Sequence, residues 1–590
     1  MRKSFSKNCA WLAVHCVCTV VLCCCSYSGR AQYIDIETVG KSLNDKIKDK
    51  KPFKISGGIN ANTIFYTGNT GNTRDPFNYL LSGNVTMSLY GFTVPASFSL
   101  TNQGFSHQYS YPRPPTRLSL HPKYKWITGH IGTVSMSLSP YTFNGMVFTG
   151  AGADITPAGS KFKYSFLYGR LQKAVEYKPG NGNTQATYKR SGYGVKVLYD
   201  NGPFKLGTAV FRGKDDMGSL AFKPDSLQIF PQENTAVSFE TSVPLIKNVL
   251  FKVEYGLSVF TRDQRSPKIT DSTKVSGLVK LLGGRLSSSL YKALKTELSY
   301  TVGSAMIGVG YERVDPEFQT LGSYYFTNDI ENITANFARA LFKGKINLSG
   351  NIGLQRDNLD NKKSSVSRRN VGAVNVSYVG SKRFTATVSY SNFQSFTNIR
   401  PQFQYINQQT PFDNLDTLNY RQLSQNTNAN FNYILSESQE RPQNLNVNIS
   451  MQDAYDMQGG VILKGNASRF YNFAGNYSRS VMPKSLSISV GYNLTFNQIA
   501  GNNLLTMGPS IGANKKFFNN KVSTGASLSY NSTTAAGKML NSVAAVRMNA
   551  AYVYKKKHNL GMNLMGMRRE NSKGPSVKDI TATITYSYSF

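Results

Sequence analysis

Strict alternation of apolar and polar side chains is the feature that most limits what this chain can fold into. The final segment, DITATITYSYSF (579–590), places Ile584, Tyr586, Tyr588 and Phe590 on alternate positions, with Thr and Ser between them. Successive side chains of a β-strand point to opposite faces, so this segment is predicted to be a strand with one apolar face. An unpaired apolar edge strand promotes aggregation, and closing the sheet into a barrel removes the edge. The segment favours a closed barrel, with an ordinary amphipathic strand as the alternative.

The same alternation recurs along the chain from residue 53. Asn, Ser, Thr, Gly and Gln dominate the positions opposite the apolar ones, where a water-soluble sheet would carry Lys and Glu. Small neutral polar groups suit a wet lumen, and Tyr and Phe near strand ends suit membrane interfaces. We therefore predict an all-β fold, a transmembrane antiparallel β-barrel of about 20–24 strands, at roughly 9–11 residues per strand. The clearest runs are 53–61, 79–89, 162–168, 193–208, 249–259, 346–354, 445–451, 486–496, 522–530 and 546–554.

Five irregular segments are too long for tight turns and are predicted to be long loops on one side of the barrel. They contrast with short links such as Asp200-Asn201-Gly202, which we interpret as periplasmic turns. The long segments are 104–124, 178–191, 213–234, 315–329 and 393–425.

The amino terminus is predicted to be a secretory signal peptide over residues 1–31. Arg2, Lys3 and Lys7 precede an apolar stretch, and Gly29-Arg30-Ala31 offers small residues for cleavage. A lipoprotein signal ending at Cys25 is a minor alternative, because Cys24 stands where a small residue is usual. Residues 32–51 are predicted to form a short helix or tether, and residues 52–590 the barrel. The predicted location is the outer membrane of a Gram-negative bacterium.

Charge and cysteine content exclude several function classes for the mature chain. All six cysteines lie within residues 1–31, so no disulfide or thiolate site is expected. Removing that segment takes four of the 67 basic residues and none of the 32 acidic ones, which leaves an excess of 31 positive charges. Scattered basic residues on an exported chain fit lipopolysaccharide phosphates or an anion-selective lumen, and we expect no nucleic-acid partner.

The sequence offers little catalytic chemistry, and we predict no enzyme activity, catalytic residue, cofactor or metal site. The mature histidines are His107, His121, His130 and His558, and none has a metal-binding spacing. His121 and His130 with Asp154 and a nearby Ser leave a barrel hydrolase as a remote alternative.

Two resemblances follow from particular residues. The segment ending at Tyr586, Tyr588 and Phe590 resembles the carboxy-terminal assembly signal of bacterial outer-membrane barrels, which implies the barrel-assembly machinery as a partner. PFKISGG (52–58), DPFNYLLSGN (75–84), SPYTFNG (139–145), GAGADITP (150–157), YGRLQKAVE (168–176) and GYERVDPEFQTLGSYYFTND (310–329) resemble a family of large Bacteroidota outer-membrane barrel proteins. That resemblance implies a barrel and an outer-membrane address, and it supplies no activity.

The segment 310–329 is the best candidate for a functional loop. Functional loops are often held by a rigid scaffold. We predict that this loop folds into the lumen and constricts it, with Arg313 facing Asp315 or Asp329; an ordinary surface loop with a local ion pair is the alternative. The candidate residues are Arg313, Asp315, Glu317, Tyr324 and Asp329.

The function predicted from these features is a porin-like channel or conduit for solutes across the outer membrane. Polar strand faces and positive charge favour transport of small or anionic solutes. The alternative is a structural or assembly subunit of an envelope or secretion complex, with other subunits of that complex as partners.

Overall fold

The computed structural model describes most of the chain from residue 53 onward. The predicted signal peptide, the predicted tether over 32–51 and most of the 393–425 segment lie outside the described residues. The described ranges are 53–69, 75–102, 117–176, 186–221, 228–269, 277–324, 326–362, 368–392, 395–396, 421–455, 457–458, 461–462, 467–499 and 501–590.

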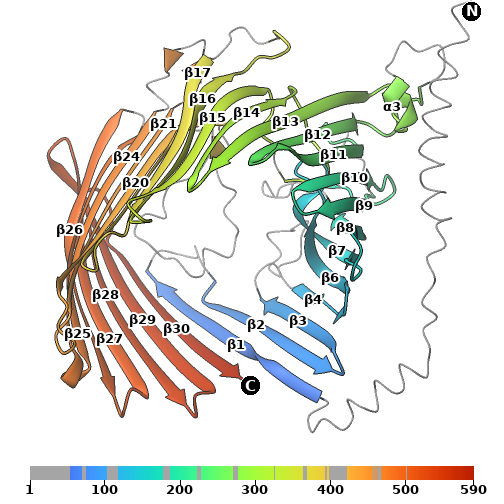
Figure 1. Ribbon diagram of the computed structural model, residues 1–590. Coiled ribbons are helices and arrows are strands. Elements are labelled where there is room, and N and C mark those ends of the chain that lie inside the picture. Colours follow the sequence, from blue (N-terminus) through green and yellow to red (C-terminus); the bar gives the residue numbers. More distant parts are fainter. Residues whose placement is uncertain are drawn as a thin grey trace, which may run out of the picture. The chain divides into compact units, whose positions relative to one another are not determined.

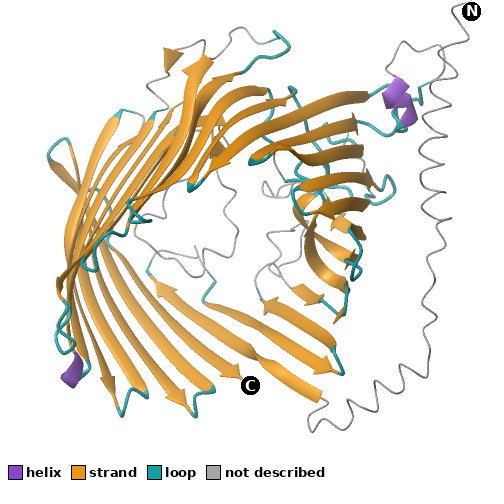
Figure 2. Ribbon diagram, viewed as in Figure 1, coloured by secondary structure: helices purple, strands orange, loops and turns teal. Residues whose placement is uncertain are grey.

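The described residues are almost entirely β-structure (Figure 2). The helical elements among them are α3 (Gly277–Leu281) and the 3-10 helix η3 (Met482–Lys484). The strands are β1 (Phe53–Gly68), β2 (Phe77–Leu89), β3 (Phe92–Thr101), β4 (Arg117–Leu120), β5 (Lys123–Tyr124), β6 (Ile127–Ser137), β7 (Asn144–Ile155), β8 (Phe162–Gln172), β9 (Arg190–Asn201), β10 (Phe204–Asp215), β11 (Glu233–Ile246), β12 (Val249–Thr261), β13 (Ser288–Val302), β14 (Ala305–Val314), β15 (Ile330–Leu341), β16 (Ile346–Arg356), β17 (Arg368–Tyr378), β18 (Phe384–Ser391), β19 (Ser395–Phe396), β20 (Arg421–Ser436), β21 (Gln443–Tyr455), β22 (Met457–Gln458), β23 (Val461–Ile462), β24 (Ser468–Val481), β25 (Leu486–Ile499), β26 (Asn502–Phe517), β27 (Val522–Ala535), β28 (Lys538–Tyr554), β29 (His558–Asn571) and β30 (Val577–Ser589). No helix in the described part of the chain is long and apolar enough to cross a membrane.

The chain divides into two compact units, one of residues 1–55 and 87–93 and the other of residues 56–86 and 94–590. In the first unit, the link between β2 and β3 has positive φ at both Tyr90 (48°) and Gly91 (82°). Two consecutive positive φ values are typical of a type I′ turn, whose twist matches that of a hairpin. The link between β2 and β3 is therefore a tight hairpin turn.

The second unit contains a closed antiparallel β-barrel, which confirms the predicted fold class. Neighbouring strands pair in chain order, and β1 closes the cylinder against β30 from Gly58 opposite Ser589 to Gly68 opposite Asp579 (Figure 1). The barrel has 26 strands, two more than the upper end of the predicted 20–24. Many connections at one end are only two residues long, such as 202–203, 247–248 and 303–304, so the same length of chain forms more strands than predicted.

The carboxy-terminal strand takes part in this closure to its last residue. The backbone N–H of Phe590 donates to the carbonyl of Gly57 at 3.0 Å, and Gly57 N–H donates to the Phe590 carbonyl at 3.0 Å. The rings of Tyr588 and Phe590 stack with centroids 5.5 Å apart. Pairing with β1 thus leaves no free edge at β30. A role for Tyr586, Tyr588 and Phe590 as an assembly signal stays a prediction.

Each strand of the barrel has an inner and an outer face, and the two differ in chemistry. On β10 the exposed Leu206 and Val210 alternate with the buried Ala209 and Phe211. The same division continues across the sheet, since Ile307, Val309, Ile333 and Leu354 on β14–β16 are also exposed and share one face in the strand register. A continuous exposed apolar face is the arrangement expected where strands meet hydrocarbon.

Candidate functional site

Two loops pack onto the inner face of β6–β15, and we call them the inner loops (138–143 and 315–329). The ring of Phe143 lies 5.8 Å from the ring of Phe148 on β7 and 5.2 Å from that of Phe211 on β10. Side chains from separated strands meet one ring only on the concave side of the wall. Phe318 is fully buried in the same cluster, with its ring 5.9 Å from that of Tyr141. The inner loops therefore fill part of the barrel with a small hydrophobic core.

The two inner loops are joined by their backbones. Phe143 and Gly322 form a parallel β-bridge, and Asn144 N–H donates to the Gly322 carbonyl at 3.0 Å. A Cβ on Gly322 would lie 2.4 Å from the Thr142 carbonyl oxygen, closer than real Cβ contacts. Glycine is thus required where the loops cross.

Asn234, on β11, anchors the inner loops to the barrel wall. Its buried side-chain amide donates to Ser258 Oγ at 2.7 Å and to the Val259 carbonyl at 3.1 Å. Its Oδ1 accepts from the Thr320 hydroxyl at 2.8 Å and from Leu321 N–H at 3.2 Å. The sequence places Asn234 at the end of a predicted loop and gives no signal of this role, because its loop partners lie more than 80 residues away.

A charged wall lies beside the inner loops, on the inward positions of β9–β14. Lys196 Nζ is 2.8 Å from Glu240 Oε1, and Lys252 Nζ is 3.7 Å from Glu297 Oε2. A cavity of about 520 Å³ has Lys205, Glu240, Lys252, Glu254, Lys295 and Glu297 among its lining residues. In the sequence, Lys252 and Glu254 occupy the polar face of the strand predicted over 249–259. Alternation therefore indicated that these two charges face the lumen.

The inner loop 138–143 contacts the charged wall directly. The hydroxyl of Ser139 donates to Glu254 Oε1 at 3.2 Å. Burial, followed by the nearby carboxylates of Glu312 and Glu254, raises the pKa of Tyr141 well above its ordinary value near 10. The phenol is therefore neutral and able to donate a hydrogen bond at any physiological pH.

The inward positions of β20, β21, β24 and β25 form a second wall, which we call the amide wall. Asn446 Nδ2 donates to Asn430 Oδ1 at 3.4 Å, and Asn448 Nδ2 donates to Asn428 Oδ1 at 3.2 Å. The Thr495 hydroxyl donates to Asn472 Oδ1 at 2.9 Å. Each amide offers two donors and an acceptor, so this wall can exchange hydrogen bonds with water or a polar solute without a charge. The polar Asn, Ser and Thr positions predicted from the sequence thus form one continuous inward surface across these four strands.

The structure places Arg313 on β14, on the same face as the exposed Ile307 and Val309. This is the outer face, so the Arg313 side chain points away from the hydrophobic core that the inner loops form inside the barrel. Its guanidinium is 3.8 Å from Asp315 and 3.8 Å from Glu331. The strands end at Val314 and resume at Ile330, which matches the loop predicted over 315–329. The alternation of outward and inward side chains over 305–314 was the sequence signal for the direction of Arg313.

The other candidate residues hold the loop in place. Glu317 accepts hydrogen bonds from Arg262 and, at 3.1 Å, from the Tyr291 hydroxyl. Tyr324 Oη accepts from Val147 N–H at 2.9 Å, and buried Asp329 accepts from Leu359 N–H at 2.8 Å. The side chains that loop 315–329 contributes to the inner core are apolar, chiefly Phe318 and Leu321. A constricting role for the five predicted residues stays a prediction.

His121, His130 and Asp154 form a hydrogen-bonded chain on the inner face of β6 and β7. His121 Nδ1 is 2.9 Å from His130 Nδ1, and His130 Nε2 is 2.9 Å from Asp154 Oδ2. The Ser165 hydroxyl donates to Asp154 Oδ1 at 2.6 Å, so the carboxylate stands between the serine and His130. A serine nucleophile needs the imidazole as its base, so this order differs from that of a hydrolase triad. Burial and neighbouring His130 lower the pKa of His121.

Within the described residues, no group of three or more His, Cys, Asp or Glu side chains is placed to hold a metal ion.

Comparison with known proteins gives structural likeness only. No protein-family model matches the chain, and no curated protein matches it. Among solved structures, Pseudomonas aeruginosa OccK3 (OpdO) shares 9% identity over 94% of this chain and 99% of its own, with a TM-score of 0.31. The P pilus usher (PapC) translocation pore shares 10% identity over 91% and 99%, also with a TM-score of 0.31. Acinetobacter baumannii OccAB3 shares 12% identity over 65% and 98%, with a TM-score of 0.29. At these identities the likeness concerns the fold alone.

Proposed function

We propose that this chain is an outer-membrane conduit for small hydrophilic solutes. The observation that carries the proposal is the contrast between the two faces of one closed wall. Large apolar side chains are exposed on the outer face, while Asn, Ser, Thr and paired Lys and Glu occupy the inner face. A wall of this kind is stable in hydrocarbon and wet inside.

The two inner walls indicate which solutes would pass. The amide wall can form hydrogen bonds with hydroxyl, carbonyl and carboxylate groups alike. The charged wall pairs Lys with Glu, as in Lys196 with Glu240, so it presents little net field. The conduit would therefore admit small polar solutes with little selection by charge, with the inner loops narrowing the path on the β6–β15 side.

Planar-bilayer recording with charge substitutions in the amide wall tests the proposal. Asn448→Asp together with Asn476→Asp adds two negative charges to inward positions of β21 and β24. If the lumen conducts, the reversal potential measured in a salt gradient would then shift in the direction of greater cation selectivity. The matched control, Ser381→Asp with Ser438→Asp, adds the same charge at exposed turns. An unchanged reversal potential in the amide-wall variant, or no conductance from the folded wild type, would overturn the proposal.

A structural or assembly role is the second candidate, and the inner hydrophobic core favours it. Loops 138–143 and 315–329 bury Phe143, Phe318 and Leu321 inside the barrel, which reduces the open section on that side. Purification in mild detergent would separate the two functions, since an assembly subunit retains stoichiometric partner chains. With either function, we also propose that the chain belongs to the Bacteroidota family and is exported through a cleaved signal peptide.

A further inference from the structure

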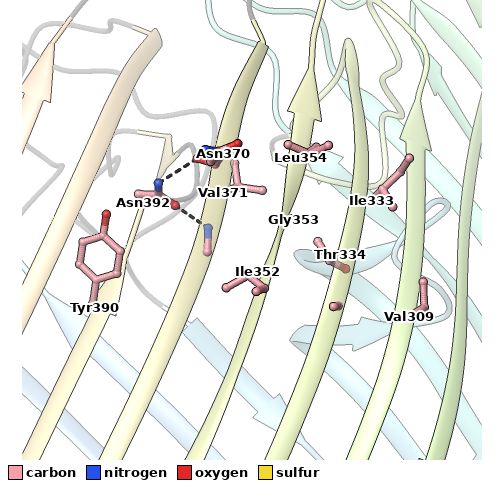
Figure 3. Close-up of a pocket in the computed structure, with 12 residues that line it drawn as sticks. Val309, Ile333, Thr334, Ile352, Gly353, Leu354, Asn370, Val371, Tyr390 and Asn392 are labelled. Carbon is pink, nitrogen blue, oxygen red and sulfur yellow. Dashed lines mark hydrogen bonds between the residues drawn. The ribbon is translucent and has the colours of Figure 1, made fainter.

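An apolar groove runs along the outer face of β14–β18, near the end of the strands that carries the long connections (Figure 3). Its volume is about 650 Å³. Ile333 lies opposite Leu354 and Ala335 opposite Ile352 in the strand register. These residues share a face with exposed Val309, so the groove opens away from the lumen.

Small residues create the groove between larger neighbours. Ala335 and Gly372 occupy outward positions beside Ile352. A Cβ on Gly372 would lie 3.4 Å from Ile352 Cγ2 and 3.2 Å from the Asn351 carbonyl oxygen. The side-chain amide of Asn392 is already engaged, since its Nδ2 donates to the Asn370 carbonyl at 2.9 Å (Figure 3). The space is thus left mainly to apolar contact with the outward side chains of β14–β16.

A cationic cluster lies at the end of this groove. Glu331 stands opposite both Arg313 on β14 and Arg356 on β16. It binds Arg356 directly, lies 3.8 Å from Arg313 and accepts from the Tyr311 hydroxyl at 2.8 Å. The Glu331 side chain is only 13% exposed, whereas the arginines are 40% and 49% exposed. Glu331 therefore orients two guanidinium groups whose other donors face the surroundings.

The net charge of the cluster is positive. Exposed Lys292 on β13 adds a third cation on the same face, beside Asp315, whose Oδ2 accepts from Lys292 N–H at 2.9 Å. Three cations face two carboxylates, Glu331 and Asp315. Arginine binds phosphate through paired N–H donors, and such bonds are stronger where water is sparse.

We propose that the groove and the cluster together bind a phosphorylated glycolipid of the outer leaflet. One acyl chain would lie along Ile333, Ala335, Ile352 and Leu354, and a phosphate would contact Arg313 and Arg356. The orientation rests on the proposed function, because long connections mark the extracellular end of an outer-membrane barrel. At that end the arginines lie at headgroup level and the groove lies just below, at acyl-chain level.

Lipid A and its dephosphorylated form are the probes that test this inference. Both are titrated against purified full-length protein in phosphatidylethanolamine nanodiscs, and bound lipid is counted by native mass spectrometry. Arg313→Gln with Arg356→Gln is expected to weaken lipid A binding at least about tenfold and to erase the preference for the phosphorylated form. Ala335→Phe fills the groove and is expected to weaken both forms.

The matched control is Arg383→Gln, which breaks an exposed pair with Glu437 at 3.0 Å at the other end of the barrel. It is expected to bind lipid A as the wild type does. Heat-dependent mobility in electrophoresis reports folding of each variant. Equal binding of both lipid forms to wild type, or unchanged binding to the double variant, would overturn the inference. Conductance in lipid A-free bilayers is measured in parallel, so a failed lipid site with intact conductance leaves the conduit standing.

Discussion

The hydroxyl of Ser139 donates a hydrogen bond to the carboxylate of Glu254 over 3.2 Å, from an inner loop to the charged wall. Ser139 is buried, and its oxygen also accepts from Tyr141 N–H at 3.1 Å. One serine thus fixes the turn of the inner loop 138–143 and its position on β12. Movement of that loop would require breaking this contact.

Replacement of Ser139 by alanine is expected to loosen the loop without unfolding the barrel. The loss removes a hydrogen bond to a carboxylate, at a cost of about 1–3 kcal/mol. Urea unfolding followed by Trp126 fluorescence measures the cost, and bilayer recording should show more frequent conductance fluctuations. The exposed Ser438→Ala serves as the control. Identical conductance noise in Ser139→Ala and wild type would contradict the link between this bond and loop position.

Replacement of Gly322 by alanine is expected to force the two inner loops apart. The new methyl group would lie 2.4 Å from the Thr142 carbonyl oxygen and 3.0 Å from Phe143 Cα, both backbone atoms. Overpacking of this kind costs about 1–3 kcal/mol. Gly566→Ala is the matched control, because a Cβ there has nothing within 4 Å. Equal urea midpoints for the two variants would show that the loops do not cross as described.

Replacement of Asn234 by alanine is expected to release the inner loop 315–329 from the wall. It removes the acceptor of the Leu321 N–H, while Thr320 and Ser258 keep their bonds to the Thr142 and Gln319 carbonyls, so the expected cost is about 1–3 kcal/mol. The freed loop should raise mean conductance, because the inner core no longer narrows the path. Asn430→Ala, on the amide wall, provides a control that removes an inward amide without touching the loop. A conductance equal to wild type would argue against a narrowing role.

The two-residue alternation of apolar and polar side chains predicted the barrel, because a strand between lipid and water must present an apolar residue at every second position. The same parity, followed through Ile307 and Val309, would also have placed Arg313 outside. Asn234 could not be predicted in this way. Its role arises from contacts with Thr320 and Leu321, and nothing local to residues 233–235 reports them. Likewise, the inner core depends on which loop reaches which strand, and alternation carries no such information.

Tyr141 is expected to make the barrel more sensitive to alkali. Burial raises its pKa in the folded state, while in the unfolded chain the phenol titrates near about 10. A raised folded pKa means that its stabilising contribution is complete below about pH 10 and is lost as pH rises further, because only the unfolded chain then ionises freely. Urea midpoints at pH 8 and about pH 11 should therefore diverge more in the wild type than in Tyr141→Phe. Tyr168→Phe, at an exposed outer position, should behave as the wild type does. Parallel loss of stability in Tyr141→Phe and wild type would exclude a buried neutral phenol at the contact between the inner loops and the charged wall.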